Sequence, residues 1–139
     1  MPGVCVIVAY RPKAGKGDEV LALVRGRVPN LREEGLVTER QPVIMRSRDG
    51  TIIEVSEWKS REAIESAHKN PNVLAMWNKF FAVCDCVPLN RLEEAQEMFA
   101  GFEPIEDSHL YFSGVVSPMQ QRLALPAATE KIPTGTVFL

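Results

Sequence analysis

The chain has 139 residues, which is the length of one domain, and 45% hydrophobic with 24% charged residues is an ordinary composition for a soluble globular protein. A net charge of −2 without a basic stripe argues against nucleic acid as a partner. The three cysteines are an odd number, and Cys84 and Cys86 lack the spacing of a zinc site, so we expect neither a disulfide framework nor a metal.

The first predicted element is a strand over residues 4–10, where VCVIVAY forms a continuous apolar run. Such a run is typical of a strand that is buried on both faces, although a buried helix can share the pattern. The run is too short to span a membrane, and no basic region precedes it as in a signal peptide. We therefore expect a cytoplasmic protein that has no membrane partner.

A helix is predicted between the break at RPKAGKGD and Gly35. Asp18 is the expected N-cap, and Gly35 is the expected terminator. Pro29 lies inside the periodic pattern and is expected to kink the helix or to end it early. The apolar positions with helical spacing are Val20, Val24, Val28 and Leu31.

Residues 36–58 are predicted to form two strands around the turn Asp49-Gly50. Asp-Gly favours a two-residue hairpin turn, because both residues can adopt positive φ. Such a turn places Met45 opposite Glu54 and Arg46 opposite Ile53. Alternation then separates two faces of the second strand, one carrying Ile52, Glu54, Ser56 and Trp58 and the other carrying Ile53, Val55 and Glu57.

The next predicted helix is capped by Ser60 and interrupted at Asn70-Pro71, where Asn can cap a new helix and Pro suits its first position. The apolar stripe continues to Cys84, and we expect Pro88 to end this helix. RLEEAQEMFAGF then predicts a short helix, and FEPIE predicts a last core strand.

The predicted order is β-α-β-β-α-β, the ferredoxin-like split βαβ arrangement of an α+β fold with an antiparallel sheet, over residues 1–106. Residues 107–139 have several prolines and no clear period, and they predict a C-terminal arm or tail. Helices on one face of the sheet leave the other apolar face bare. We expect a homodimer in which a second copy covers it, although the arm could cover its own sheet or clasp a partner.

The segment from Gly35 to Val73 resembles the antibiotic biosynthesis monooxygenase (ABM) family of dimeric α/β barrels. The resemblance covers about residues 3–106 and is carried by Gly35-Leu36, Asp49-Gly50, Glu57-Trp58-Lys59-Ser60, Ala67-His68 and Asn70-Pro71. It implies a homodimeric barrel with a pocket between helices and sheet in each subunit. Some members oxidise polyketide-type aromatics or quinols with molecular oxygen and no cofactor, another branch degrades haem, and many have no assigned activity.

The haem-degrading branch fits this chain poorly. When that branch is anchored on Trp58-Lys59-Ser60, its asparagine falls near Tyr10, its helix tryptophan on Ala67 and its haem-ligating histidine on Trp77. An indole cannot ligate iron as imidazole does, so haem would need a ligand such as His68 or His109. Ala-His at positions 67 and 68 resembles the quinol-monooxygenase-like members instead.

His68 is the predicted catalytic residue, because an imidazole that titrates near neutrality can take a proton from a phenol or hydroquinol. The resulting phenolate is richer in electrons and reacts more readily with oxygen. The structural alternative is a half-buried histidine that bonds a backbone carbonyl.

The predicted substrate-binding residues are Tyr10, Glu54, Trp58, Trp77 and Phe81. Glu54 could orient His68 or hold a substrate hydroxyl, and Tyr10 could donate a hydrogen bond into the pocket. The two tryptophans could flank a flat aromatic ligand. The structural alternatives are core packing for the aromatic residues and, for Glu54, an ion pair with Arg40, Arg46 or Arg48.

The leading functional hypothesis is a cofactor-independent monooxygenase that acts on a phenolic, quinol or polyketide-like small molecule. The second is a non-catalytic dimeric barrel that binds a small aromatic or hydrophobic ligand. The third is an assembly module. A pocket that contains His68 and a polar partner would favour the enzyme.

Overall fold

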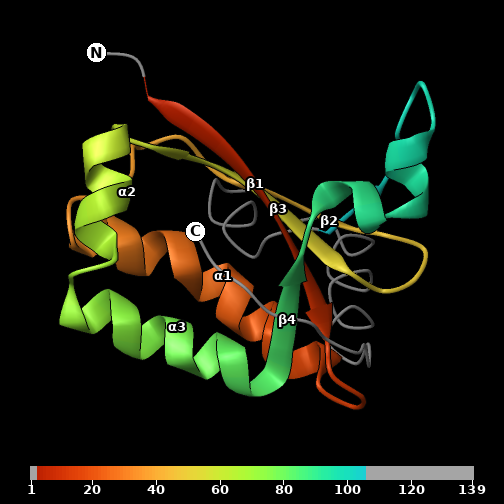
Figure 1. Ribbon diagram of the computed structural model, residues 1–139, viewed down its shortest axis with the longest axis horizontal. Coiled ribbons are helices and arrows are strands. Elements are labelled where there is room, and N and C mark those ends of the chain that lie inside the picture. The colour runs from red at the N-terminus through yellow and green to blue at the C-terminus, as the bar shows by residue number, and fades with distance from the viewer. Residues whose placement is uncertain (1–2, 106–139) are drawn as a thin grey trace, which may run out of the picture.

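The computed structural model of the chain describes residues 3–105, so the predicted arm or tail and His109 lie outside the described part. The strands form one antiparallel sheet in the order β4-β1-β3-β2-β5, which confirms the predicted ferredoxin-like α+β fold (Figure 1). The elements are β1 (Val4–Pro12), α1 (Gly17–Glu33), β2 (Val43–Arg46), β3 (Ile52–Trp58), α2 (Arg61–Ala67), α3 (Pro71–Val83), β4 (Cys84–Val87), η1 (Leu89–Arg91), η2 (Glu93–Gln96) and β5 (Glu103–Pro104).

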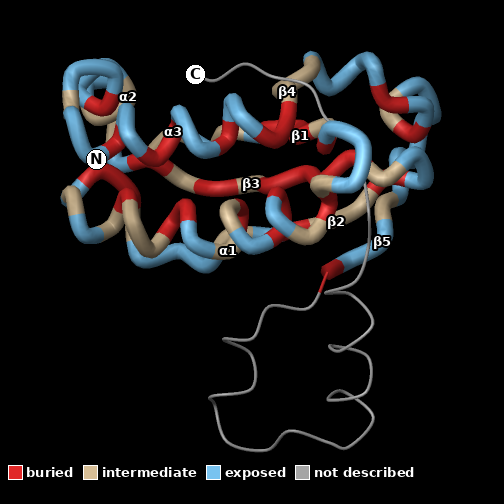
Figure 2. Tube along the Cα trace, turned by 90° about the horizontal axis from the view of Figure 1, so that it is seen from below, coloured by how far each residue is buried: buried red, intermediate tan, exposed pale blue. Residues whose placement is uncertain are grey.

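The main core lies between one face of the sheet and the two long helices. Alternate residues of β1 and β3 point into it, among them Val8, Tyr10, Ile52 and Trp58. Figure 2 shows the buried residues gathered along β3 and on the inner sides of α1 and α3. A smaller cluster of Ala9, Ile53 and Leu92 lies on the opposite face, where the segment of residues 88–102 covers part of the sheet.

Helix α1 ends as predicted but begins and continues differently. The N–H of Leu36 donates to the carbonyl of Leu31 over 3.0 Å, and Gly35, at φ 75°, donates to Arg32 over 2.9 Å, which is the Schellman pattern. Lys16, not Asp18, is the N-cap residue, and Asp18 lies in the first turn, where its charge favours the positive helix end. Pro29 does not end the helix, because tertiary packing of the following turn outweighs one lost backbone hydrogen bond.

The hairpin register differs by one residue from the prediction. Met45 pairs with Ile53, Arg46 pairs with Ile52, and the N–H of Ser47 donates to the carbonyl of Thr51 over 2.8 Å. The loop therefore has three residues, Arg48 to Gly50, and only Gly50 takes positive φ, at 93°. A tight turn followed by a left-handed glycine is the usual three-residue solution, and Asp-Gly suits it as well as a two-residue turn. The predicted faces of β3 are nevertheless right, since Ile52, Glu54, Ser56 and Trp58 are all buried.

The caps of α2 and α3 are as predicted. The Ser60 side chain accepts a hydrogen bond from the N–H of Ala63, and the Asn70 side chain accepts from Asn72 and Val73. Pro71 is at the start of α3. These local contacts divide the region into two helices at the predicted break.

The region after α3 corrects three predictions. The helix ends at Val83, and Cys84–Val87 form β4, which pairs with the outer edge of β1. FEPIE supplies only the two-residue strand β5 on β2. RLEEAQEMFAGF contains no α-helix, and its residues Leu92 and Glu94 are both buried. Residues two apart point to different sides of an α-helix, so an extended path with short turns buries both better.

Candidate functional site

A buried polar cluster lies between α1 and the helix-facing side of the sheet. Arg27 from α1, Tyr10 from β1 and Glu54 from β3 are each fully buried, and Ser56 is 3% exposed. Arg27 Nη1 donates to Glu54 Oε1 over 2.9 Å and to Ser56 Oγ over 3.4 Å. The Tyr10 hydroxyl donates to the same Glu54 oxygen over 3.0 Å. Residues from three separate elements thus converge on one carboxylate.

The electrostatics of the cluster keep Tyr10 neutral and Arg27 charged. Burial raises the pKa of Tyr10 well above its ordinary value, and nearby Glu54 adds to this, whereas Arg27 opposes it. Burial lowers the pKa of Arg27, but Tyr10 and Glu54 outweigh that effect and leave it raised. The guanidinium and the carboxylate therefore balance each other, and Tyr10 remains a hydrogen-bond donor.

Arg27 keeps unused hydrogen-bonding capacity inside the protein. Its Nε and Nη2 atoms are buried and have no hydrogen-bond partner within residues 3–105. Its Cζ atom lies 5.7 Å from the centroid of the Trp58 ring, which gives a cation–π contact but supplies no lone pair. Buried donors without acceptors are rare in folded proteins and mark a place where a ligand or water can bind.

Three of the predicted site residues come together in the buried cluster, and aromatic rings lie next to it. Tyr10 and Glu54 share the hydrogen bond described above, and Trp58 lies beside Arg27. The Tyr10 ring stacks on Phe80 with the centroids 5.2 Å apart and the planes at 27°. A flat aromatic ligand is the type of molecule that such rings favour.

His68 lies elsewhere, at the C-cap of α2, and its side chain is exposed. Its Nδ1 atom is 2.9 Å from the carbonyl oxygen of Ile64, and its ring meets Trp77 edge-on at 5.1 Å. If Nδ1 donates this bond, Nε2 remains an acceptor. These contacts are with α2 and α3 and not with the hydrogen bond between Tyr10 and Glu54, so the catalytic role of His68 stays a prediction.

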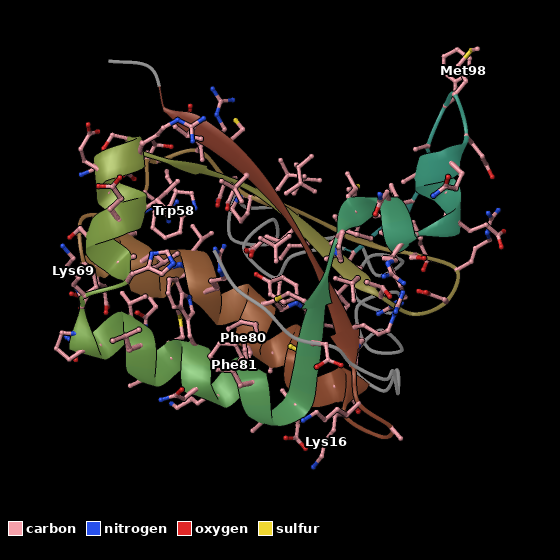
Figure 3. All side chains as sticks on the ribbon, in the orientation of Figure 1. Lys16, Trp58, Lys69, Phe80, Phe81 and Met98 are labelled. Atoms are coloured by element: carbon pink, nitrogen blue, oxygen red, sulfur yellow. The ribbon has the colours of Figure 1, made fainter. Side chains whose placement is uncertain are left out.

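The two other predicted aromatic residues both lie on α3. Trp77 is 3% exposed and packs against His68, and Phe81 on α3 is 39% exposed (Figure 3). The suggested arginine partners of Glu54 were wrong. Arg40 pairs with Glu57, Arg46 with Glu103 and Arg48 with Glu93, and Glu54 pairs with Arg27 instead.

Arg27 is the residue that the sequence-based reasoning missed. It lies seven residues after Val20 and four before Leu31, which is the spacing of the buried stripe of α1. A charge on an otherwise apolar stripe was the available signal. The sequence could not show which carboxylate it would meet, because Glu54 is distant in the chain.

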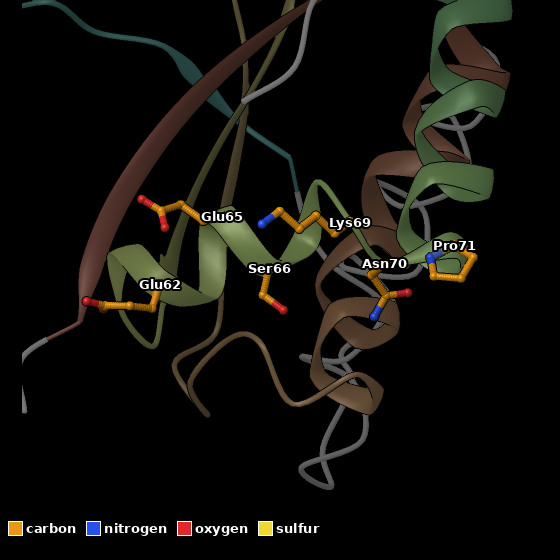
Figure 4. Close-up of a pocket in the computed structure, with 6 residues that line it drawn as sticks. All are labelled: Glu62, Glu65, Ser66, Lys69, Asn70 and Pro71. Atoms are coloured by element: carbon orange, nitrogen blue, oxygen red, sulfur yellow. The ribbon is translucent and has the colours of Figure 1, made fainter.

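Mostly polar side chains line two of the hollows on the surface of the described part. The larger, about 540 Å³, runs along α2 to the start of α3 and is lined by Glu62, Glu65, Ser66, Lys69, Asn70 and Pro71 (Figure 4). The second, about 320 Å³, lies at the hairpin loop and is lined by Ser47, Arg48, Asp49, Glu93 and Glu94. Neither is lined by a predicted site residue.

Residues 3–105 hold no group of three or more His, Cys, Asp or Glu side chains placed to bind a metal ion. None of the helices described is both long and apolar enough to cross a membrane.

A family model described as antibiotic biosynthesis monooxygenase matches residues 3–79, which extend from β1 into α3 and include Tyr10, Arg27, Glu54 and Trp58. No curated protein and no solved structure matches the chain.

Proposed function

Because the chain belongs to the antibiotic biosynthesis monooxygenase family, whose model matches more than half of it, we propose that it is a cofactor-independent monooxygenase acting on a phenolic, quinol or polyketide-like small molecule. The observation that carries the proposal is the buried cluster of Arg27, Glu54 and Tyr10. Burying two charges costs free energy of desolvation, and apolar residues of similar volume often stabilise a core as much as a buried ion pair does. A fully buried ion pair whose arginine has further donors therefore favours a functional site over a purely structural one.

The cluster has the groups that oxidation of a phenol requires. Glu54 can accept the phenolic proton, and the Arg27 guanidinium can stabilise the oxyanion that remains. Tyr10 is a neutral donor that orients the carboxylate. Oxygen then adds to a ring carbon of the phenolate, and loss of water from the hydroperoxide leaves a carbonyl. For a hydroquinone the balance is one quinol plus one O₂ giving one hydroxyquinone plus one water, with one of the two atoms of O₂ in each product.

The test measures oxygen consumption and product mass with a panel of hydroquinones and polycyclic phenols under ¹⁸O₂. We expect one labelled oxygen in the product and a loss of turnover of about 10²- to 10⁴-fold in Glu54→Gln, the usual contribution of a general base. Lys79→Gln on the exposed side of α3 is the matched control for an amide substitution. Heat-denatured protein corrects for spontaneous oxidation of the quinols.

His68→Ala is included to compare the two candidate bases. No turnover by the wild type, or equal turnover by Glu54→Gln at equal folded content, would contradict the proposed use of the buried cluster. A loss confined to His68→Ala would keep the enzyme and move proton transfer to α2.

We infer a homodimer from the sheet face that lies away from the helices. Ile7 and Val43 both pair with Val55, so these three residues form an apolar row across β1, β3 and β2. Ile7 is 50% exposed and Val43 is 52% exposed. A second copy packed on this face would bury the row. Sedimentation velocity should show a dimer that Val43→Asp weakens, while a monomeric wild type would refute the inference.

A binding protein without catalysis is the second candidate. The exposure of His68 favours this candidate, because its imidazole lies outside the water-excluded interior in which Tyr10 and Glu54 meet. Saturable binding of the same phenols without oxygen consumption would establish it.

A further inference from the structure

The unpaired edge of Arg27 restricts the kind of ligand that the buried cluster can take. Arg27 Nη1 carries two hydrogens, and Glu54 and Ser56 offer acceptors for both. The Nε–H and the Nη2–H on the same side of the planar guanidinium remain, and both nitrogens are buried without a partner in the described part. Together they form a side-on fork that matches two neighbouring oxygen atoms.

A second donor without a partner belongs to the aromatic ring that Arg27 contacts. The indole Nε1–H of Trp58 is buried and has no acceptor within residues 3–105, and the Trp58 ring centroid is 5.7 Å from Arg27 Cζ. Both residues are fully buried. Their surroundings therefore lack acceptors, not donors, and a ligand that fits must supply lone pairs.

The charge balance of the cluster argues against an anionic ligand. The positive charge of Arg27 is already paired with Glu54 at 2.9 Å, and Tyr10 is neutral. A carboxylate on the fork would add a second negative charge to a cluster whose ion pair, within the described residues, involves one cation, Arg27. Burying such an uncompensated charge is unfavourable, whereas a neutral oxygen pair meets the donors without it.

We propose that the Nε and Nη2 edge of Arg27 binds two adjacent oxygen atoms of an electrically neutral aromatic ligand, a phenol with a carbonyl group on the neighbouring ring carbon. This inference rests on the proposed function and names the substrate class of the same site. It makes Arg27 a binding residue and leaves Glu54 to accept the phenolic proton. Since Arg27 is fully buried, binding requires the covering side chains to move, which favours small planar ligands.

The test compares three probes that share one ring, 2-hydroxyacetophenone, acetophenone and benzoate. The first has the neutral oxygen pair, the second lacks its hydroxyl, and the third has an oxygen pair with a negative charge. Binding is followed by chemical-shift titration of the two indole N–H signals, which Trp77→Phe assigns. None of these measurements depends on turnover, so failure of the binding inference can be distinguished from failure of the proposed reaction.

We expect the wild type to bind 2-hydroxyacetophenone about tenfold more tightly than acetophenone or benzoate, with shifts at Trp58. Arg27→Lys keeps the positive charge but lacks the fork, so it should lose most of the discrimination. The double variant Arg27→Met with Glu54→Gln removes both charges together and should lose all of it. Arg61→Met, at an exposed position of α2, is the control and should keep the full discrimination between the three probes.

Equal affinities for the three probes, or no binding by the wild type, would overturn the proposal. Preference for benzoate would show that the fork takes an acid and would overturn the neutral class. Full discrimination in Arg27→Lys would exclude the fork as its source. If the double variant does not fold by circular dichroism, the Arg27→Lys result and the wild-type probe series decide.

Discussion

The buried ion pair between Arg27 and Glu54 makes a quantitative prediction about stability. Both side chains are 0% exposed, and their closest atoms are 2.9 Å apart. Arg27→Met removes the guanidinium but keeps a stem of similar length, which leaves the Glu54 carboxylate buried without its cation. Breaking a buried pair in this way costs about 3–5 kcal/mol in the free energy of unfolding. That is a large part of the roughly 5–15 kcal/mol typical of a domain.

The measurement is urea denaturation at a fixed protein concentration, because dimerisation would make the midpoint depend on concentration. With a urea m-value of about 2 kcal/mol/M, the midpoint of Arg27→Met should fall by about 2 M. The double variant Arg27→Met with Glu54→Gln leaves no charge unpaired, so we expect it within about 2 kcal/mol of the wild type. Lys16→Met breaks the exposed pair with Glu19 and serves as control, with an expected loss below about 1 kcal/mol.

Two results would refute this reasoning. One is a loss below about 1 kcal/mol in Arg27→Met, which would mean that water or relaxation reaches the carboxylate. The other is a double variant that is as unstable as the sum of the two single variants, which would mean that the two residues act independently.

Three further predictions concern other parts of the fold. Gly35→Ala should lower the free energy of unfolding by about 1 kcal/mol, because alanine is strained at φ 75°. Gly26→Ala inside α1 should raise it by about 0.5–1 kcal/mol, because alanine favours a helix and the added Cβ meets no atom within 4 Å. Thermal denaturation compares the midpoints of the two variants. Burial raises the pKa of Glu94, but hydrogen bonds from the Arg48 N–H and from Ser47 outweigh that effect and leave the pKa lowered. The ionised Glu94 therefore stabilises the fold above the ordinary carboxyl pKa, and this stabilisation is lost as the pH falls through its lowered pKa. Glu94→Gln should be less stable than the wild type at pH 7, and the difference should be smaller at pH 3. An equal difference at both pH values would contradict this. Burial raises the pKa of Cys84 to about 12, so Cys84 should resist alkylation in the native protein and react once the protein unfolds, as peptide mass mapping should show.

Features whose cause is local were predictable from the sequence. Gly35 ends α1, and Ser60 and Asn70 cap α2 and α3, because each acts on backbone groups a few residues away. The alternation of β3 also placed Glu54 and Trp58 on the buried face. The hairpin register failed because Asp-Gly is compatible with loops of two and three residues, which differ by one step in pairing.

Features that depend on distant partners were not predictable in the same way. CDCV has no strong strand pattern, and it becomes β4 because the edge of β1 offers unpaired backbone groups directly after α3. Arg27 stands on the buried stripe of α1, but its partner is 27 residues further along the chain. Spacing along one helix can show that a charge is buried, whereas only the fold shows what compensates it.

The same distinction bears on where the proposed chemistry occurs. His68 was the most reactive residue type in the family-like segment. Its side chain is nevertheless exposed at the end of α2, and its ring is hydrogen-bonded to the Ile64 carbonyl. Glu54 and Arg27 are ordinary charged residues in the sequence and become exceptional by complete burial. Charge interactions are stronger in a water-excluded interior, so a developing phenolate gains more from Arg27 than from an exposed imidazole. We therefore expect Glu54→Gln to reduce turnover more than His68→Ala does, and the reverse order would place the proton transfer on α2.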